Sequence, residues 1–373
     1  MKNKILFIGS TPPPQHGVST ANETLLNSSL VQQFNVKLLD ITDRRDLDNM
    51  GKLELLNILL ALKHNFLLIY FLLIFRPNII YLNLSQNRWA YLRDGVFLLI
   101  TRIIHPKSKI VAHLNGGYFH SFYKNESKYI QKLIDITLKN IHRVIVVGDC
   151  LKYIFMNKVR DIVVVPNGVA DLHYFQLNGE IKKTRDIFHV SFISNFFEEK
   201  GIITFIKAAR LILKKSTNIH FHLAGHFIEN EDKTSREIRD FLREYENDER
   251  VLYHGVVRGK EKEELLLKTH IFILPSFYHY EGHPLVLLEA LSCGCVLISS
   301  EQGAIGEIVE EGKTGFILPA KNELRLAKKI FELVSDPDAL QKMSRNARQS
   351  YLNRFTNEIF ANNMINVFHE TLS

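Results

Sequence analysis

The sequence predicts an α/β protein with two doubly wound, Rossmann-like domains that face each other across a cleft. A chain of 373 residues suits two domains better than one core. Short runs of β-branched residues alternate with helical patterns, which is typical of parallel sheets. This alternation stops at a polar stretch near the middle of the chain and then starts again.

Each half of the chain carries six predicted strands. Those of the first half lie at 4–10, 35–41, 78–84, 109–114, 143–148 and 161–168, and those of the second half at 187–194, 219–225, 250–257, 271–276, 295–300 and 315–319. Between them, residues 171–186 are polar and lack periodicity, which indicates a linker. We therefore expect an N-terminal domain over 1–175 and a C-terminal domain over 176–355.

The composition is that of a globular protein, with 46% hydrophobic and 23% charged residues. Three cysteines, Cys150, Cys293 and Cys295, are too few for a disulfide framework, and their C-G-C spacing lacks the second pair of a zinc site. We expect them to be small core residues. Residues 1–14 contain no apolar segment before a cleavage site, so a cytoplasmic location is expected.

The most apolar segment, residues 55–75, has Lys63, His64 and Asn65 at its centre. A lysine in the middle of a membrane span costs about 2.5–3.5 kcal/mol. We therefore expect two short helices, or one helix with a polar break, that are largely buried. A contact of this region with a membrane surface stays open.

The net charge of +7 is unevenly distributed. Residues 1–175 hold 21 Lys and Arg against 12 Asp and Glu, whereas the rest holds 26 against 28. This excess suits an anionic partner such as acidic lipid headgroups. The sequence resembles no nucleic-acid-binding module, so nucleic acid is not expected as a partner. A solvated basic face remains an equal alternative.

Ligands of doubly wound sheets bind beyond the carboxyl ends of the strands. The turn after the first strand lacks G-x-G-x-x-G, which disfavours a nicotinamide-dependent dehydrogenase. It does place Gly17 directly before a helix, where a phosphate could approach the backbone. His113 ends the fourth strand and could contact substrate or move a proton, although a structural role is equally compatible.

In the second half, Asn195 follows the first strand, and Lys200 opens the next helix, where a cation would favour phosphate. Glu281 and Glu289 lie in an E-x7-E spacing on either side of Pro284, which is expected at the first helical position. The amides of Gly282, His283 and Leu285 would be free at this helix start. Carboxylates that bind hydroxyls, beside a helix end that binds an anion, indicate a nucleotide sugar.

Residues 272–319 closely resemble the C-terminal signature of retaining GT-B glycosyltransferases of family 4. The resemblance continues along the chain in family order, through the Gly17 loop, His113, the "VPNGV" at 165–169, Lys200 and the E-x7-E block. It is nearest to bacterial enzymes of O-antigen, capsule or exopolysaccharide assembly. A last helix over 356–373 that returns to the N-terminal domain is implied as well.

The resemblance also implies a role for each candidate residue. Glu289 would hold the ribose, Glu281 the transferred sugar, Lys200 the diphosphate, His113 the sugar near its reacting carbon and Gly17 the donor phosphates or the acceptor. The backbone of Gly282, His283, Pro284 and Leu285 would lie near the sugar hydroxyls and the diphosphate. Catalytic roles are thus expected for Glu281, His113 and Lys200.

Two positions depart from the family pattern. Asn195 stands where an arginine is usual, and Arg258 is the candidate to replace that cation. The first loop reads His16-Gly17 instead of Gly-Gly. No D-x-D metal motif is recognised in a plausible loop, and residues 43–48 are not interpreted as one, so neither a metal nor another cofactor is expected.

The expected function is therefore transfer of a sugar, with retention, from a nucleotide-sugar donor to a lipid-linked or polysaccharide acceptor of a bacterial surface glycan. A UDP-sugar is the expected donor. The N-terminal domain is expected to attach peripherally to the cytoplasmic, anionic face of the cell membrane. A nucleotide-sugar epimerase of the same fold and a non-catalytic carbohydrate- or lipid-binding protein remain as alternatives.

Overall fold

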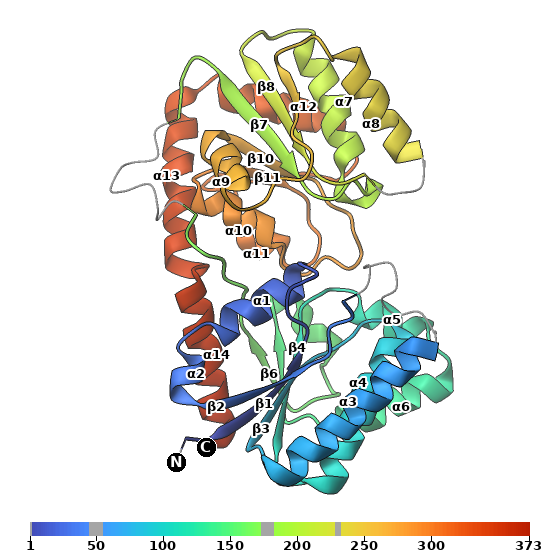
Figure 1. Cartoon of the computed structure of the whole chain (residues 1–373). Coiled ribbons are helices and arrows are strands. Elements are labelled where there is room, and N and C mark those ends of the chain that lie inside the picture. Colours follow the sequence, from blue (N-terminus) through green and yellow to red (C-terminus); the bar gives the residue numbers. More distant parts are fainter. Residues whose placement is uncertain (1, 45–54, 173–182, 228–232) are drawn as a thin grey trace. The chain divides into compact units, whose positions relative to one another are not determined.

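The computed structural model describes residues 2–44, 55–172, 183–227 and 233–373 (Figure 1). The chain forms two compact units: unit 1 consists of Met1–Gly168 together with Asn357–Ser373, and unit 2 of Val169–Thr356. Residues 173–182 of the predicted linker, and residues 45–48 of the segment inspected for a metal motif, lie outside the described residues.

Unit 1 is built on a parallel sheet of six strands in the order β2-β1-β3-β4-β5-β6. The strands are β1 Lys4–Gly9, β2 Asn35–Asp40, β3 Ile79–Asn83, β4 Lys109–Leu114, β5 Arg143–Val146 and β6 Asp161–Val164. The helices are α1 Gly17–Leu26, α2 Leu30–Gln33, α3 Leu55–Ile74, α4 Arg88–Ile104, α5 Phe119–Asn125, α6 Lys128–Leu138, the 3-10 helix η2 Asp149–Ile154 and α14 Asn357–Leu372.

Both faces of this sheet are covered by helices, which explains why its strands are continuous apolar runs. Leu6 and Ile8 of β1 pack into a cluster with α3, α4 and α6, whereas Ile5 and Phe7 pack on the other face with α1 and α14 (Figure 1). Since side chains alternate along a strand, every second residue serves the same face.

Unit 2 repeats this plan with a parallel sheet in the order β12-β11-β10-β7-β8-β9. The strands are β7 Phe188–Ile193, β8 Ile219–Ala224, β9 Val251–Tyr253, β10 Ile271–Leu274, β11 Val296–Ser299 and β12 Gly315–Ile317. The helices are the 3-10 helix η4 Glu198–Lys200, α7 Ile202–Leu213, α8 Lys233–Glu244, α9 Gly259–Lys268, α10 Leu285–Ser292, α11 Ile305–Ile308, α12 Glu323–Val334 and α13 Pro337–Arg354. The predicted α/β class with two doubly wound units is confirmed.

Helix α3 differs from the prediction for residues 55–75. It is one uninterrupted helix of 20 residues, and it is buried on one face only. Lys63 lies on the exposed side, so the polar centre does not break the helix, and its exposed residues also include Phe66 and Leu73. Among the described residues, no helix combines the length and the apolar character of a membrane-spanning segment.

Helix α14 belongs to unit 1, although the chain reaches it only after completing unit 2. Phe360, Met364 and Phe368 are buried in the same cluster as Ile5 and Phe7 of β1. Its apolar residues recur three and four positions apart, so they form one stripe along the helix. The last helix thus completes one face of the first sheet.

The loops that follow neighbouring strands of unit 2 pack tightly on one another. Gly303, after β11, has a φ of +56°, and a Cβ atom there would lie 2.3 Å from the carbonyl oxygen of Glu281. The amide of the next residue, Ala304, donates to the carbonyl of Gly282 at 2.7 Å. Only glycine fits both this backbone conformation and this distance. The loop after β11 therefore fixes the position of residues 281–282.

A chain of hydrogen-bonded imidazoles crosses strands β7 to β9. His189 Nδ1 lies 2.8 Å from His222 Nε2, and His222 Nδ1 lies 2.9 Å from His254 Nε2. Burial lowers the pKa of His222 to about 3 and that of His189 to about 4, and the neighbouring histidines and Lys268 act in the same direction. These rings are therefore neutral at pH 7, which agrees with a series of imidazoles in which each hydrogen bond between two rings contains a single proton.

Replacing Gly303 by alanine is expected to lower the free energy of unfolding by about 1–3 kcal/mol, because the new Cβ meets backbone at a positive φ. Gly306→Ala is the matched control, since a Cβ at Gly306 would contact no atom. Thermal unfolding of the two variants measures the difference. Equal unfolding temperatures would contradict the close packing at Gly303.

Unfolding of unit 2 is expected to become easier as the pH falls from about 6.5 to about 4. Between these pH values the histidines of the unfolded chain bind protons, whereas the buried rings of the folded state stay neutral. The stability that they contribute is therefore present above about pH 6.5 and is lost as the pH falls. Each fully buried ring contributes at most about 1.4 kcal/mol per pH unit. Urea unfolding at several pH values should show a shallower dependence for His222→Gln, but not for His279→Gln in an exposed loop.

Candidate functional site

The carboxyl ends of β7 and β10 bring Lys200 and Glu281 together. Because these strands are parallel neighbours, their following loops leave the sheet at the same edge. The Nζ atom of Lys200 lies 2.7 Å from Oε2 of Glu281. The lysine side chain is 17% exposed and the carboxylate 8%, so both charges are largely removed from water. Removing either partner would leave the other as an uncompensated charge.

Close backbone packing holds this ion pair in place. Gly201 has a φ of +84°, and a Cβ atom there would lie 2.4 Å from the carbonyl oxygen of Pro275. The amide of Phe277 donates to the carbonyl of Glu199 at 2.7 Å. The loop that carries Lys200 is therefore attached to the loop that leads to Glu281.

Two more side chains complete the surroundings of the pair. The hydroxyl of Ser276 donates to Oε2 of Glu281 at 2.8 Å. The ammonium group of Lys200 lies 4.5 Å from the ring centroid of Tyr278, a cation–π contact. Burial, together with nearby Tyr280 and Glu281, raises the pKa of the Tyr278 hydroxyl. A lysine held in this way still has N–H donors for an anionic ligand.

Helix α10 starts one residue later than the sequence predicted. Pro284 is its N-cap, with a φ of −65° and a ψ of 119°, and Leu285 is its first residue. In the described part of the chain, the amides of Gly282 and Leu285 donate no hydrogen bond to the protein. Burial lowers the pKa of His283 to about 3, so this ring is neutral. The helix start thus offers free N–H groups and its positive dipole end.

Glu289, one turn into α10, pairs with a lysine that the sequence did not indicate. Its Oε1 lies 2.6 Å from Nζ of Lys262 on α9, and the two side chains are 17% and 25% exposed. Glu281, in the loop before α10, and Glu289, within α10, are thus each paired with a lysine. A carboxylate in this position can exchange the ammonium group for ligand hydroxyls.

Asn195, which departs from the family pattern, and Arg258, the candidate to replace the missing arginine, do not form part of these pairs. Asn195 is exposed in the loop after β7, and Arg258 is the exposed N-cap of α9. Within the described residues, neither side chain has an ion pair or hydrogen bond with Glu281 or Glu289. The cation that reaches α10 from α9 is Lys262, four residues after Arg258.

In unit 1, Gly17 is the first residue of α1 and His16 is its N-cap. The amide of Ser19 donates to Nδ1 of His16 at 3.3 Å, and the amide of His16 donates to the hydroxyl of Ser19 at 2.9 Å. A Cβ atom at Gly17 would meet no atom within 4 Å, so the space beside this helix start is open. The Nε2 atom of His16 is buried and has no hydrogen-bond partner in the described structure.

His113, at the end of β4, is the last member of a buried hydrogen-bond relay. Asn22 of α1 donates from Nδ2 to the carbonyl of Ser10 and to Oδ1 of Asn83, both at 2.9 Å. Asn83 donates to the hydroxyl oxygen of Tyr81 at 3.2 Å, and that oxygen lies 2.7 Å from Nδ1 of His113. The relay therefore runs from α1 through β3 to β4.

One tautomer of His113 uses every proton of this relay. If Tyr81 accepts from Asn83 and donates its own proton to Nδ1 of His113, the ring proton lies on Nε2. Burial lowers the pKa of His113 to about 3, so the ring is neutral at pH 7. Its Nε2 is buried and unpartnered among the described residues. In this tautomer, Nε2 of His113 is an N–H donor without a partner among the described residues. A buried polar group of this kind is costly unless a ligand or water accepts its hydrogen bond.

The structure divides the candidate residues between the units. Gly17 and His113 belong to unit 1, and the others, from Asn195 to Glu289, belong to unit 2. Sequence reasoning missed Lys262, Ser276, Tyr81 and Asn83. Tyr81 and Asn83 lie at the end of a predicted strand, as His113 does, and that position was the available signal. Lys262 gave none, because its helix shows only a mixed charged pattern.

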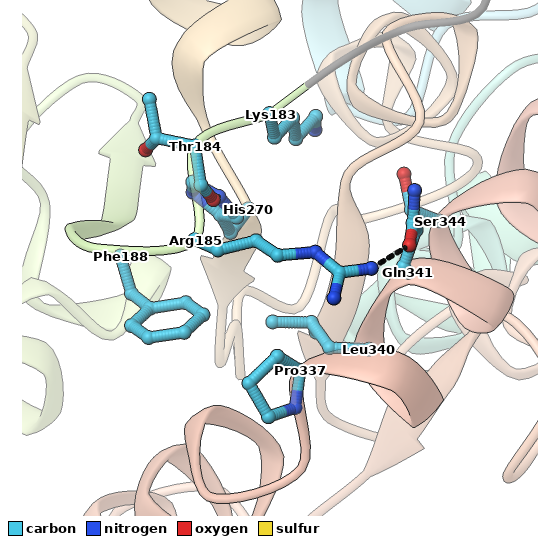
Figure 2. Close-up of a pocket in the computed structure, with 9 residues that line it drawn as sticks. All are labelled: Lys183, Thr184, Arg185, Phe188, His270, Pro337, Leu340, Gln341 and Ser344. Atoms are coloured by element: carbon cyan, nitrogen blue, oxygen red, sulfur yellow. Dashed lines mark hydrogen bonds between the residues drawn. The ribbon is translucent and has the colours of Figure 1, made fainter.

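A small cavity elsewhere in unit 2 is lined by none of the candidate site residues (Figure 2). It has a volume of about 30 Å³, and Phe188 and His270 place it near the amino ends of β7 and β10. Figure 2 shows Arg185 reaching Gln341 of α13, where the two side chains lie 2.5 Å apart, and His270 bonds to the carbonyl of Thr184 at 2.8 Å. This cavity has room for about one water molecule. The hydrogen bond between Arg185 and Gln341 attaches the segment that leads into β7 to helix α13.

Most of the second unit is similar to a known family of proteins. Residues 178–350 match the family model described as "Glycosyl transferases group 1". The chain is 26% identical over 197 residues to the phosphatidylinositol N-acetylglucosaminyltransferase gpi3 subunit of Schizosaccharomyces pombe, covering 52% of this chain and 41% of that protein. It is 25% identical over 171 residues to the putative colanic acid biosynthesis glycosyltransferase WcaL of Salmonella typhimurium, covering 44% and 41%. The chain thus spans about two fifths of the length of these curated relatives.

Among solved structures, the chain is similar in fold to Anabaena Alr3699/HepE, which was crystallised in complex with UDP. The TM-score is 0.69 at 16% sequence identity, and the match covers 99% of this chain and 100% of the other. The two six-stranded parallel sheets are therefore those of the GT-B glycosyltransferase architecture. Both lysine–glutamate pairs lie within residues 178–350, the part of the chain that matches this family model.

Proposed function

We propose that the protein is a retaining glycosyltransferase of family 4. It transfers a sugar from a nucleotide-sugar donor to a lipid-linked or polysaccharide acceptor of a bacterial surface glycan. The observation that supports this most is the pair of lysine-bound carboxylates, Glu281 and Glu289, on either side of the free amides of α10. A nucleotide sugar carries vicinal hydroxyls, which carboxylates bind, and a diphosphate, which free backbone amides bind. Its binding site therefore needs these two kinds of group side by side.

The nucleotide is assigned to the Glu289 side of α10. On donor binding, the ribose hydroxyls replace or share the ammonium group of Lys262, which lies 2.6 Å from the carboxylate in the free protein. A UDP-sugar is the proposed donor. The solved relative HepE, with UDP bound, supports this choice of base.

The diphosphate is assigned to the start of α10 and to Lys200. The unpartnered amides of Gly282 and Leu285 would bind its oxygens at the positive end of the helix. Lys200 would neutralise the charge that grows as the sugar–phosphate bond breaks, which is an electrostatic contribution to the transition state. No metal ion is part of this proposed reaction.

The transferred sugar is assigned to Glu281 of unit 2, and His113 of unit 1 is proposed separately as a hydrogen-bond donor to a sugar. Glu281 accepts hydrogen bonds from sugar hydroxyls, and the neutral His113 donates from Nε2 to a sugar oxygen. With Nδ1 engaged by Tyr81 and a pKa of about 3, His113 is a hydrogen-bond donor and no general base at pH 7. We assign no covalent nucleophile, so the acceptor hydroxyl attacks the anomeric carbon on the face that the diphosphate leaves. The bond between that carbon and the diphosphate breaks, and the hydroxyl proton passes to the departing phosphate oxygen.

The proposed acceptor is anchored in the membrane, and the protein attaches peripherally to the cytoplasmic face. The charge excess of the first half of the chain supports this location. The names of two similar proteins agree with this proposal: one name refers to phosphatidylinositol, a lipid, and the other to colanic acid biosynthesis.

Substitution of Glu289 tests the nucleotide assignment. Glu289→Gln is expected to weaken binding of UDP and of UDP-sugars by about 10- to 100-fold, because a hydrogen bond to a charged group is worth about 1.5–3 kcal/mol. Titration of the purified protein by calorimetry measures the loss, and a thermal-shift screen with UDP, GDP and their sugar conjugates identifies the base.

Lys262→Gln is the matched control, because it removes the same ion pair but keeps the carboxylate. This variant should bind UDP at least as tightly as the unmodified protein, since Glu289 no longer has a competing partner. If both variants lose affinity equally, the ion pair serves the fold and the ribose assignment is wrong. Formation of an epimer from the donor alone, without acceptor, would contradict the proposed transfer.

The tautomer of His113 can be observed directly. Nitrogen NMR of the protein labelled at histidine should show an unprotonated Nδ1 and a protonated Nε2 between about pH 5 and 8, as expected for a pKa of about 3. Tyr81→Phe removes the proton donor and should lower kcat by up to about tenfold, the value of one hydrogen bond. A protonated Nδ1 in the unmodified protein would refute the proposed relay.

A further inference from the structure

Helices α3 and α4 present an exposed apolar surface in unit 1. They pack side by side against the same face of the sheet, where Leu68 and Leu72 of α3 and Phe97 and Leu98 of α4 are buried (Figure 1). Their outer sides are apolar as well. We call this outer surface the α3–α4 face, and it is formed by Leu62, Phe66, Leu73, Trp89, Val96 and Ile103.

The members of the α3–α4 face are aligned along each helix. Leu62, Phe66 and Leu73 are spaced by four and seven residues, and Trp89, Val96 and Ile103 by seven, so each set forms one stripe. Phe66 is 72% exposed and Ile103 is 79% exposed. A helix that is apolar on all sides is normally buried, whereas the outer side of α3 faces solvent. Large exposed apolar patches usually mark a binding surface.

A basic cavity adjoins one end of this face. It has a volume of about 690 Å³ and lies at the amino ends of β4, β5 and β6. Its lining includes the cations Arg102, Lys109, Lys139, Arg143, Lys158 and Arg160, against the carboxylates Asp161 and Glu370. Arg102 is the neighbour of Ile103 on α4, so the cavity begins where the apolar stripe of α4 ends.

Only part of this positive charge is neutralised within the protein. Arg143 pairs with Asp161 and Glu370, and Lys158 pairs with Asp135. In the described part of the chain, Arg102, Lys109, Lys139 and Arg160 form no ion pair with a carboxylate. Helix α3 contains no acidic residue at all. The surface therefore combines exposed apolar side chains with uncompensated cations.

We infer that the α3–α4 face and the adjoining basic cavity dock unit 1 on a bilayer that contains anionic phospholipids. Apolar side chains of a helix that lies flat on a membrane enter the acyl boundary, and the cations beside them meet the phosphate groups. Phe66, Tyr70 and Trp89 are aromatic residues of the kind enriched at that depth. The choice of a membrane rests on the proposed lipid-linked acceptor, but the surface itself is defined by these residues alone.

A second copy of the chain is the less suitable occupant of this surface. In a symmetric dimer the same surface meets itself, so two sets of unpaired cations would approach each other. An anionic leaflet neutralises those cations and covers the apolar stripe at the same time. Charge complementarity therefore favours the bilayer.

Vesicle binding by the full chain tests the inference, and Trp89 is its natural reporter because it is the only tryptophan of the sequence. We expect at least about tenfold tighter binding to phosphatidylcholine vesicles with about one third phosphatidylglycerol than to phosphatidylcholine alone. The emission of Trp89 should shift to shorter wavelength on binding. About 1 M salt should reduce the preference for the anionic vesicles.

Three double variants separate the contributions of the surface. Phe66→Ser with Leu73→Ser should weaken binding to both kinds of vesicle by about tenfold. Arg102→Gln with Lys109→Gln should weaken binding to the anionic vesicles only. Leu324→Ser with Leu352→Ser is the matched control, because it removes two exposed leucines of unit 2, and it should bind as the unmodified protein does. All of these side chains are exposed, so the unfolding temperatures should stay unchanged.

Three results would overturn the inference: no binding to anionic vesicles, an equal loss in the control variant, or a dimer in light scattering that Phe66→Ser with Leu73→Ser dissociates. UDP binding measured on the same samples keeps the proposed function separate. UDP binding without vesicle binding removes the docking surface and leaves the transferase. Vesicle binding without binding of UDP, GDP or their sugar conjugates removes the transferase and leaves the docking surface.

Discussion

The ion pair between Lys200 and Glu281 depends on two neighbouring parallel strands ending at one edge of a sheet. Its partners are 81 residues apart in the sequence, and only the adjacency of β7 and β10 brings their charges within 2.7 Å. Because both groups are largely buried, the loops must hold them accurately, and the positive-φ glycines at 201 and 303 allow the backbones to approach closely enough. The rest of the unit 2 site is arranged around this pair.

Unit 1 uses a different kind of interaction at its own sheet edge. Its polar groups are neutral and are ordered by a directional series of hydrogen bonds from Asn22 to His113. Such a network needs every member to be satisfied, and its last atom, Nε2 of His113, has no partner within the described protein. Unit 2 thus contains lysine–glutamate ion pairs, whereas unit 1 contains a neutral histidine that is held by hydrogen bonds.

Much of this architecture could be predicted from the sequence, because strands buried on both faces are short apolar runs that are easily recognised. All twelve predicted strands occur; Lys200 and Glu281 lie in segments that follow strands, and His113 lies near the end of one. Contacts between elements could not be predicted. Lys262 meets Glu289 only because the fold brings the side chain of one helix within reach of the other, and the relay through Tyr81 requires the register of β3 against β4.

The error for α3 has a similar physical origin. A lysine inside an apolar run was expected to interrupt the helix, yet a long flexible side chain on the solvent side costs a helix little. The alternation of apolar and polar residues that normally reveals the outer face is missing in α3. Hydropathy alone therefore could not distinguish a buried helix from one whose second apolar face is open to a partner.

The position of α14 has a consequence for the order in which the protein matures during synthesis. Phe360, Met364 and Phe368 belong to the core of unit 1, and the ring of Phe368 lies 5.8 Å from that of Tyr81, which orients His113. The first unit to leave the ribosome therefore lacks part of its core until the last residues of the chain are made. Unit 2, being continuous in sequence, can fold before unit 1 is complete. A chain that ended after residue 356 would retain unit 2 with the Lys200–Glu281 pair but would leave Tyr81 without its packing partner Phe368, so only the residues of unit 1 would be affected.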